Sequence, residues 1–64
     1  MTWTHNRHGI LVSRSGLYVI APPARRGEGY ALCYRIGRLD ILGEYHTLAL
    51  AKRAAVNHAK EREL

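Results

Sequence analysis

Apolar residues in the first two-thirds of the chain fall in short runs separated by glycine, proline and polar residues. The runs cover residues 9–12, 17–21, 30–36 and 41–46, and their β-branched and aromatic content predicts strands. In the third run, large apolar residues at 30, 32, 34 and 36 alternate with Ala31, Cys33 and Arg35. Residues 37–40 are expected to form a tight turn, and Gly43 is expected at a bulge or a close approach.

The last third of the chain has a different pattern. Glycine and proline are absent after residue 43, and this shift predicts one helix over about 48–62. Thr47 precedes it at the N-cap position, where its hydroxyl can accept a hydrogen bond from the first turn. One broad face of this helix is mainly apolar and rich in alanine. Its residues are Leu48, Ala51, Ala54, Ala55, His58 and Ala59.

These elements predict an α+β fold. Short connections favour a three- or four-stranded antiparallel meander with the C-terminal helix packed on one face. Residues 9–64 are expected to form this single domain, and residues 1–8 a flexible N-terminal segment.

A sheet covered by one helix leaves its second face open, and alternation should make that face polar. Here the second face is half apolar whichever face meets the helix. The sequence does not decide which face that is. Ala31 and Cys33 would be joined by Leu42, and by either Tyr18 with Ile20 or Leu17 with Val19. We take Tyr18, Ile20, Cys33 and Leu42 as the candidate sheet-face residues. The Trp3 segment, a second copy in a homodimer or a foreign protein is expected to cover them.

Composition adds a strong positive charge. Ten lysines and arginines oppose five acidic residues in 64, for a net charge of +5, which favours a polyanionic partner. Most of the cations are arginine, whose planar fork matches phosphate. The candidate binding residues are Arg14, Arg25, Arg26, Arg35, Arg38, Lys52 and Arg53. The single cysteine excludes an internal disulfide and suits a cytoplasmic location, and no apolar run is long enough to span a membrane.

Chemistry at a catalytic or metal centre finds little support. His5, His8, Cys33, His46 and His58 lack the spacing of a structural zinc site, and His58 is interpreted as a half-buried packing residue. Asp40 and Glu44 do not form an acid–base pair. A chain this short is expected to lack a pocket of the usual size, roughly 300–1,000 Å³. We therefore expect no enzyme activity, metal or cofactor.

The junction Leu42-Gly43-Glu44-Tyr45-His46-Thr47, running into an alanine-rich helix, resembles the three-stranded-sheet-plus-helix DNA-binding domains. These include ethylene-response-factor domains and the arm-binding domains of tyrosine recombinases. The junction is also similar to the ends of small phage- or plasmid-encoded proteins. The resemblance implies a sheet whose outer face enters the major groove. Arg35 would lie on its central strand, Arg38 at the turn of that strand, and Arg25 and Arg26 in the preceding loop.

The expected function is therefore a non-enzymatic nucleic-acid-binding module, encoded by a mobile element. The alternative is a protein-binding inhibitor or adaptor that acts on a host complex, as anti-CRISPR proteins do. The sheet face and the arginines would then meet a protein or nucleoprotein surface.

Overall fold

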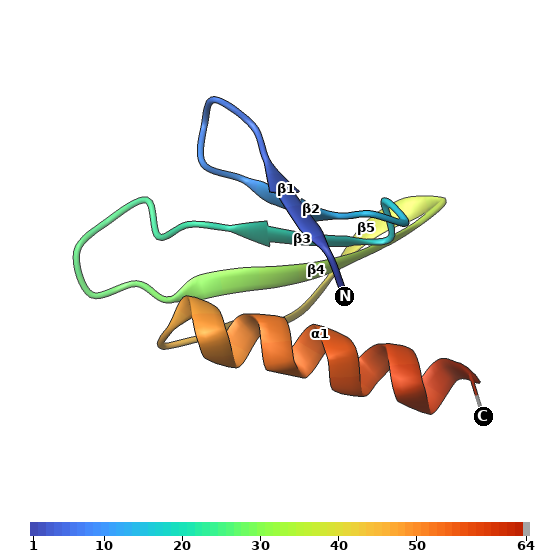
Figure 1. Cartoon of the computed structure of the whole chain (residues 1–64). Coiled ribbons are helices and arrows are strands. Elements are labelled where there is room, and N and C mark those ends of the chain that lie inside the picture. Colours follow the sequence, from blue (N-terminus) through green and yellow to red (C-terminus); the bar gives the residue numbers. More distant parts are fainter. Residues whose placement is uncertain (64) are drawn as a thin grey trace.

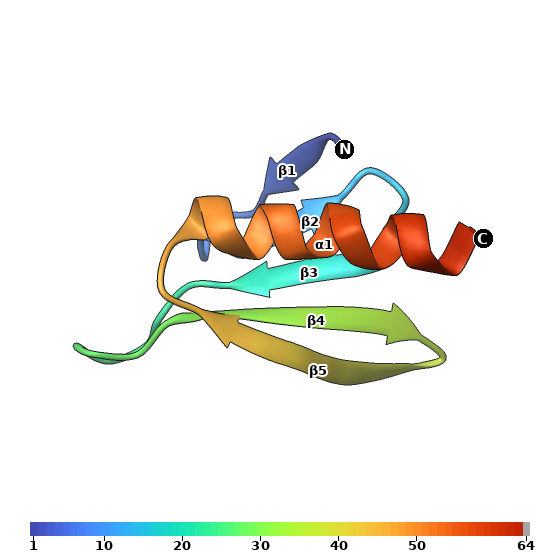
Figure 2. The same cartoon turned by 90° about the horizontal axis from the view of Figure 1, so that it is seen from below.

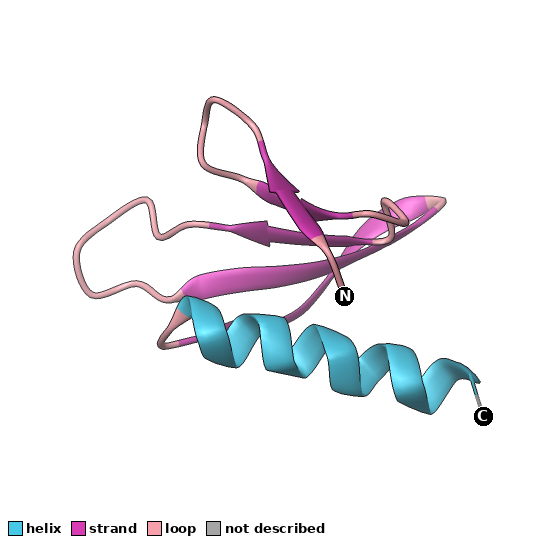
Figure 3. Cartoon of the chain, in the orientation of Figure 1, coloured by secondary structure: helices cyan, strands magenta, loops and turns pink. Residues whose placement is uncertain are grey.

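A computed structural model describes residues 1–63 as one antiparallel sheet with a helix across one face (Figures 1 and 3). The strands are β1 (Trp3–His5), β2 (Leu11–Ser13), β3 (Tyr18–Ala21), β4 (Tyr30–Ile36) and β5 (Arg38–Tyr45), and the helix is α1 (Leu48–Glu63). The strands lie side by side in chain order. The predicted α+β meander with a C-terminal helix is confirmed. Leu64, the last residue of the expected domain, lies outside the described residues.

The sheet has five strands, because the N-terminal segment also takes part. The expectation that residues 1–8 lie outside the domain is wrong. Trp3 pairs with Ser13 across β1 and β2, and its side chain packs against the core. The Asn6 side chain accepts hydrogen bonds from the backbone amides of His8 and Ile10, at 2.9 and 3.2 Å, and so closes the turn. A strand this short shows no periodicity of its own, so pairing with β2 decides its conformation.

The β4–β5 hairpin is tighter and longer than expected. Gly37 alone separates the strands, with Ile36 paired to Arg38. Its φ of 73° is a left-handed conformation that favours glycine. Residues 38–40, expected in the turn, belong to β5. Leu32 pairs with Gly43 but Cys33 pairs with Ile41, so Leu42 is the extra residue of a bulge next to the predicted position.

The core lies between the sheet and the helix. Its buried members are Tyr18, Ile20, Leu32, Tyr34, Ala51 and Ala55. The two alanines are completely buried, and their small side chains let the helix approach the sheet closely. The amide of Leu50 donates to Oγ1 of Thr47 at 3.2 Å, so the predicted N-cap is confirmed. Ile36 is 52% exposed, because the β4–β5 turn diverges from the C-terminal end of α1 (Figure 2).

Register decides which sheet face meets the helix. Tyr18 pairs with Tyr34 and Ile20 with Leu32, and all four side chains are buried in the core. Leu42 also packs against this core. The assignment of Tyr18, Ile20 and Leu42 to the uncovered face is therefore wrong. Cys33 does lie on the uncovered face, where it pairs with Val19. The sequence had left open whether Val19 or Ile20 lies on this face.

Candidate functional site

The antiparallel topology brings four arginines to one end of the molecule. The 14–17 turn, the β4–β5 turn and the C-terminal end of α1 all lie at this end (Figure 1). They carry Arg14, Arg35, Arg38 and Arg62, and we call this region the arginine end. Arg14 and Arg35 are exposed, and Arg38 is 84% exposed in its side chain. Residues that are distant in sequence thus lie at one end of the molecule, with Arg35 on the side of the sheet away from α1 and Arg62 on α1 itself.

The remaining candidate cations lie elsewhere. Arg25 and Arg26 belong to the 22–29 loop at the opposite end of the sheet (Figure 1). Arg25 is 87% exposed there and lies 4.0 Å from the Glu28 carboxylate. Lys52 and Arg53 lie in the first half of α1. The structure therefore does not bring together all the arginines that the sequence suggested as one cluster.

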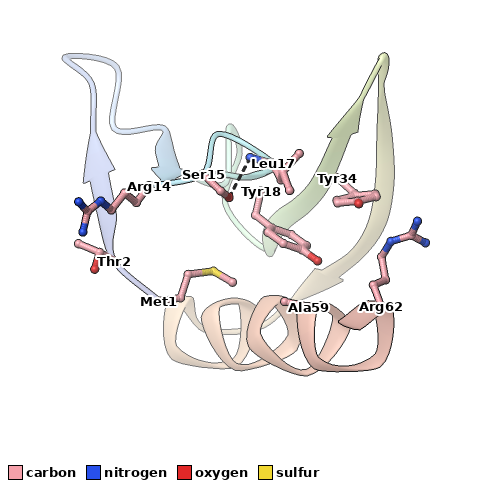
Figure 4. A pocket seen from close by; sticks show the side chains of 9 residues that line it. All are labelled: Met1, Thr2, Arg14, Ser15, Leu17, Tyr18, Tyr34, Ala59 and Arg62. Atoms are coloured by element: carbon pink, nitrogen blue, oxygen red, sulfur yellow. Dashed lines mark hydrogen bonds between the residues drawn. The ribbon is translucent and has the colours of Figure 1, made fainter. Parts of the chain in front are cut away.

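A cleft opens at the arginine end between the N-terminus, the 14–17 turn and α1 (Figure 4). Its volume is about 840 Å³, so the expectation that the chain is too small for a pocket is wrong. The lining residues are Met1, Thr2, Arg14, Ser15, Leu17, Tyr18, Tyr34, Ala59 and Arg62. Arg14 and Arg62 stand on opposite sides of the cleft in Figure 4, with the two tyrosine rings between them.

The aromatic part of the cleft is held rigidly by contacts to the helix. The ring centres of Tyr18 and Tyr34 are 5.1 Å apart, and the Tyr18 hydroxyl is hydrogen-bonded to Nδ1 of His58 at 2.7 Å. The His58 ring also lies 5.0 Å from the Tyr34 ring, which confirms His58 as a packing residue. The guanidinium carbon of Arg62 lies 5.2 Å from the centre of the Tyr34 ring, a cation–π distance that positions this charge at the cleft wall.

The arginines of this end are largely uncompensated. Nε of Arg38 lies 3.1 Å from the Asp40 carboxylate, but both side chains are substantially exposed, so this pair adds little stability. The ion pairs of the described residues do not include Arg14, Arg35 or Arg62. Three guanidinium groups thus remain available to an anionic ligand.

The uncovered sheet face is a second candidate surface. Its paired residues include Val12, Val19, Cys33 and Ile41, which register places on the side away from α1. Ile41 is 75% exposed and Leu39, paired with Arg35, is 57% exposed. We call the strand residues on this side the open face. A shallow groove of about 450 Å³ runs along it beside Arg35.

Groups for metal or thiol chemistry are dispersed. Among residues 1–63, no three His, Cys, Asp or Glu side chains lie together as metal ligands would. Cys33 is only 6% exposed, and burial raises the pKa of its thiol, which disfavours the reactive thiolate. No helix among these residues is long and apolar enough to cross a membrane.

Sequence reasoning missed Tyr34 and Arg62 as members of a site. Arg62 follows His58 by four residues, so the two lie on the same side of a helix. Extending the predicted core-facing side of α1 by one turn would have placed Arg62 at the sheet. Nothing in the sequence indicates that Met1 and the 14–17 turn meet Arg62 across a cleft, because that depends on β1 joining the sheet.

Comparison with protein-family models finds no match to this sequence, and comparisons with curated proteins and with solved structures find none either.

Proposed function

We propose that this protein binds single-stranded nucleic acid at the arginine end. The observation that carries the proposal is the cleft itself, in which Arg14 and Arg62 flank an apolar, tyrosine-containing wall. Proteins that bind single strands combine cations for the phosphates with flat side chains for the bases. The guanidinium of Arg62, positioned by the Tyr34 ring, offers both a charge and a plane on which a base can stack.

The geometry favours an unpaired strand over a duplex. A sheet that reads the major groove needs several hydrogen-bond donors on its outer face. Among the described strand residues, pairing places one cation, Arg35, on the open face, where its neighbours are Leu39 and Cys33; Arg38 lines the groove beside it. The cleft is concave and accepts a single base with its phosphate. The proposed mode therefore differs from the sheet-in-groove mode that the resemblance implies.

Fluorescence anisotropy with short labelled oligo-dT and oligo-U strands tests this proposal across a range of salt concentrations. Each phosphate contact on a single strand contributes a slope of about −0.7 to the log–log plot of affinity against salt. Replacing Arg14 and Arg62 by glutamine should flatten the slope by about 1.4, because two contacts are lost. The matched control is the Arg25→Gln, Arg26→Gln double variant, which removes the same charge at the opposite end of the sheet.

Equal flattening by the two double variants would show that binding follows net charge and not the cleft. If neither oligo-dT nor oligo-U bound at about 50 mM salt, where nonspecific attraction to nucleic acid is strong, the proposal would be refuted. Tighter binding to a duplex of the same length would contradict the single-strand preference.

A second candidate function is binding to a foreign protein complex, as an inhibitor or adaptor. The exposed Leu39 and Ile41 side chains on the open face favour it, since exposed apolar patches mark protein-binding surfaces. In this case Ile41→Asp should abolish capture of the target in a pull-down, while the Arg14→Gln, Arg62→Gln variant should retain it. The reverse pattern would assign capture to the arginine end.

A further inference from the structure

The open face is the side of the sheet that α1 does not cover. Helix α1 packs on the other side of the sheet (Figures 1 and 2), and Val12, Val19 and Cys33 lie paired across the middle of the open face. Ile41, paired with Cys33, projects from it at 75% exposure. A sheet face of this composition is normally covered by a second layer.

The accessible surface of the chain is large for its mass. It amounts to 4960 Å², whereas a compact monomer of 7.2 kDa is expected to expose about 4,100 Å². The excess of about 800 Å² is close to the area that each partner contributes to a standard protein interface. The open face carries Leu39 and Ile41, two of the exposed large hydrophobic residues, so it is the surface that we assign to such an interface.

The charges on this face have a symmetric arrangement. Pairing between β4 and β5 places Arg35 and Glu44 on the open face, toward opposite ends of the strands. Arg35 lies two residues after Cys33 on β4, and Glu44 pairs with Ala31, two residues before Cys33. The positive and negative charges are therefore displaced equally, by about 6.6 Å along the strand, from the level of Cys33.

We propose that the open face packs against the open face of a second copy of this chain. The two-fold axis lies between the sheets, perpendicular to the strands, at the level of Cys33 and Ile41. Rotation about this axis reverses the strands and brings Arg35 of each copy toward Glu44 of the other. Such self-complementarity is the requirement of a two-fold interface.

The local packing accommodates this arrangement. Face-to-face sheets lie about 10 Å apart, a distance that an arginine and a glutamate can bridge together. Arg35 would lie over Ala31 of the other copy, whose small side chain leaves room for it beside the paired Glu44. Oε1 of Glu44 accepts a hydrogen bond from the Gly29 amide at 2.8 Å, which fixes the carboxylate and leaves its second oxygen for the arginine. The resulting sandwich buries Leu39 and Ile41.

Light scattering on the size-exclusion-purified full chain at micromolar concentration tests the inference. The wild-type protein should have the mass of two chains. Arg35→Glu places two carboxylates together, and Glu44→Arg places two guanidinium groups together. Each change should raise the dimer dissociation constant about tenfold or more, and the Arg35→Glu, Glu44→Arg double variant should recover most of the lost affinity.

Two further variants keep the test independent of folding defects. Ile41→Lys changes a side chain that is 75% exposed in the monomer, so it should leave the circular dichroism spectrum unchanged while producing monomers. Arg53→Glu, an equal charge reversal on the exposed side of α1, should leave the dimer unchanged. A monomeric wild-type chain, or a dimer that resists Ile41→Lys, overturns the inference. So does a double variant that is no tighter than the single ones. None of these results bears on the arginine-end cleft, which anisotropy tests separately.

Discussion

The packing of helix α1 on the sheet makes a quantitative prediction at Ala55. This residue is completely buried in the core cluster, which also contains Tyr18 and Tyr34. Ala55→Leu adds three heavy atoms where no exposed surface remains, so the helix must move away from the sheet. Overpacking of this kind costs about 1–3 kcal/mol of unfolding free energy. For a 64-residue chain, each 1 kcal/mol lowers Tm by about 7 °C, so we expect a decrease of about 7–20 °C.

Thermal denaturation followed by circular dichroism at 222 nm measures this effect. All samples need the same protein concentration, because self-association makes Tm concentration-dependent. The matched control is Ala49→Leu, the same substitution at an exposed position on the same helix. It should change the unfolding free energy by less than about 0.5 kcal/mol. Equal effects at the two positions, or a larger one at Ala49, would refute the assigned orientation of α1.

Two other predictions concern the sheet. A Cβ atom at Gly29 would lie 2.6 Å from the backbone oxygen of Tyr45. Gly29→Ala should therefore lower the unfolding free energy by about 1–3 kcal/mol, as measured by urea titration. An unchanged urea midpoint would contradict the close approach of β4 and β5. Burial raises the pKa of Cys33, so the folded state holds the thiol proton more tightly and loses stability as pH rises through the ordinary thiol pKa. Iodoacetamide should alkylate Cys33 more slowly in the folded than in the urea-unfolded chain, because burial limits access to the thiol and disfavours the reactive thiolate. Equal rates would contradict the burial.

Local patterns were enough to predict the main elements of the fold. The absence of glycine and proline after residue 43 and the N-cap at Thr47 predicted α1 almost to its observed bounds. Alternation from Tyr30 to Ile36 predicted β4. These features depend on propensity and on neighbours within a few residues, so they can be read from one sequence. β1 escaped prediction because a strand as short as Trp3–His5 owes its conformation to its partner.

The candidate site was predictable only in part. Arginine content indicated an anionic partner, and the arginine end does include the predicted Arg14, Arg35 and Arg38. Arg25 and Arg26 share their charge and exposure but lie in a loop at the opposite end. The charge of a sequence does not show where the charged side chains lie in the fold. Whether two arginines lie at the same end of the sheet depends on the number of strands between them.

The sequence by itself determined the strand-rich first part, the terminal helix, the strong positive charge and the presence of apolar residues on both sheet faces. Tertiary structure alone decided that Tyr18 and Ile20 face the helix and that Val19 and Cys33 do not. Both faces have enough apolar residues to meet a helix, so their composition does not choose between them. The choice depends on size, because Tyr18, Ile20, Leu32 and Tyr34 fill the space above Ala51 and Ala55. Burial of these large side chains leaves the smaller apolar face exposed.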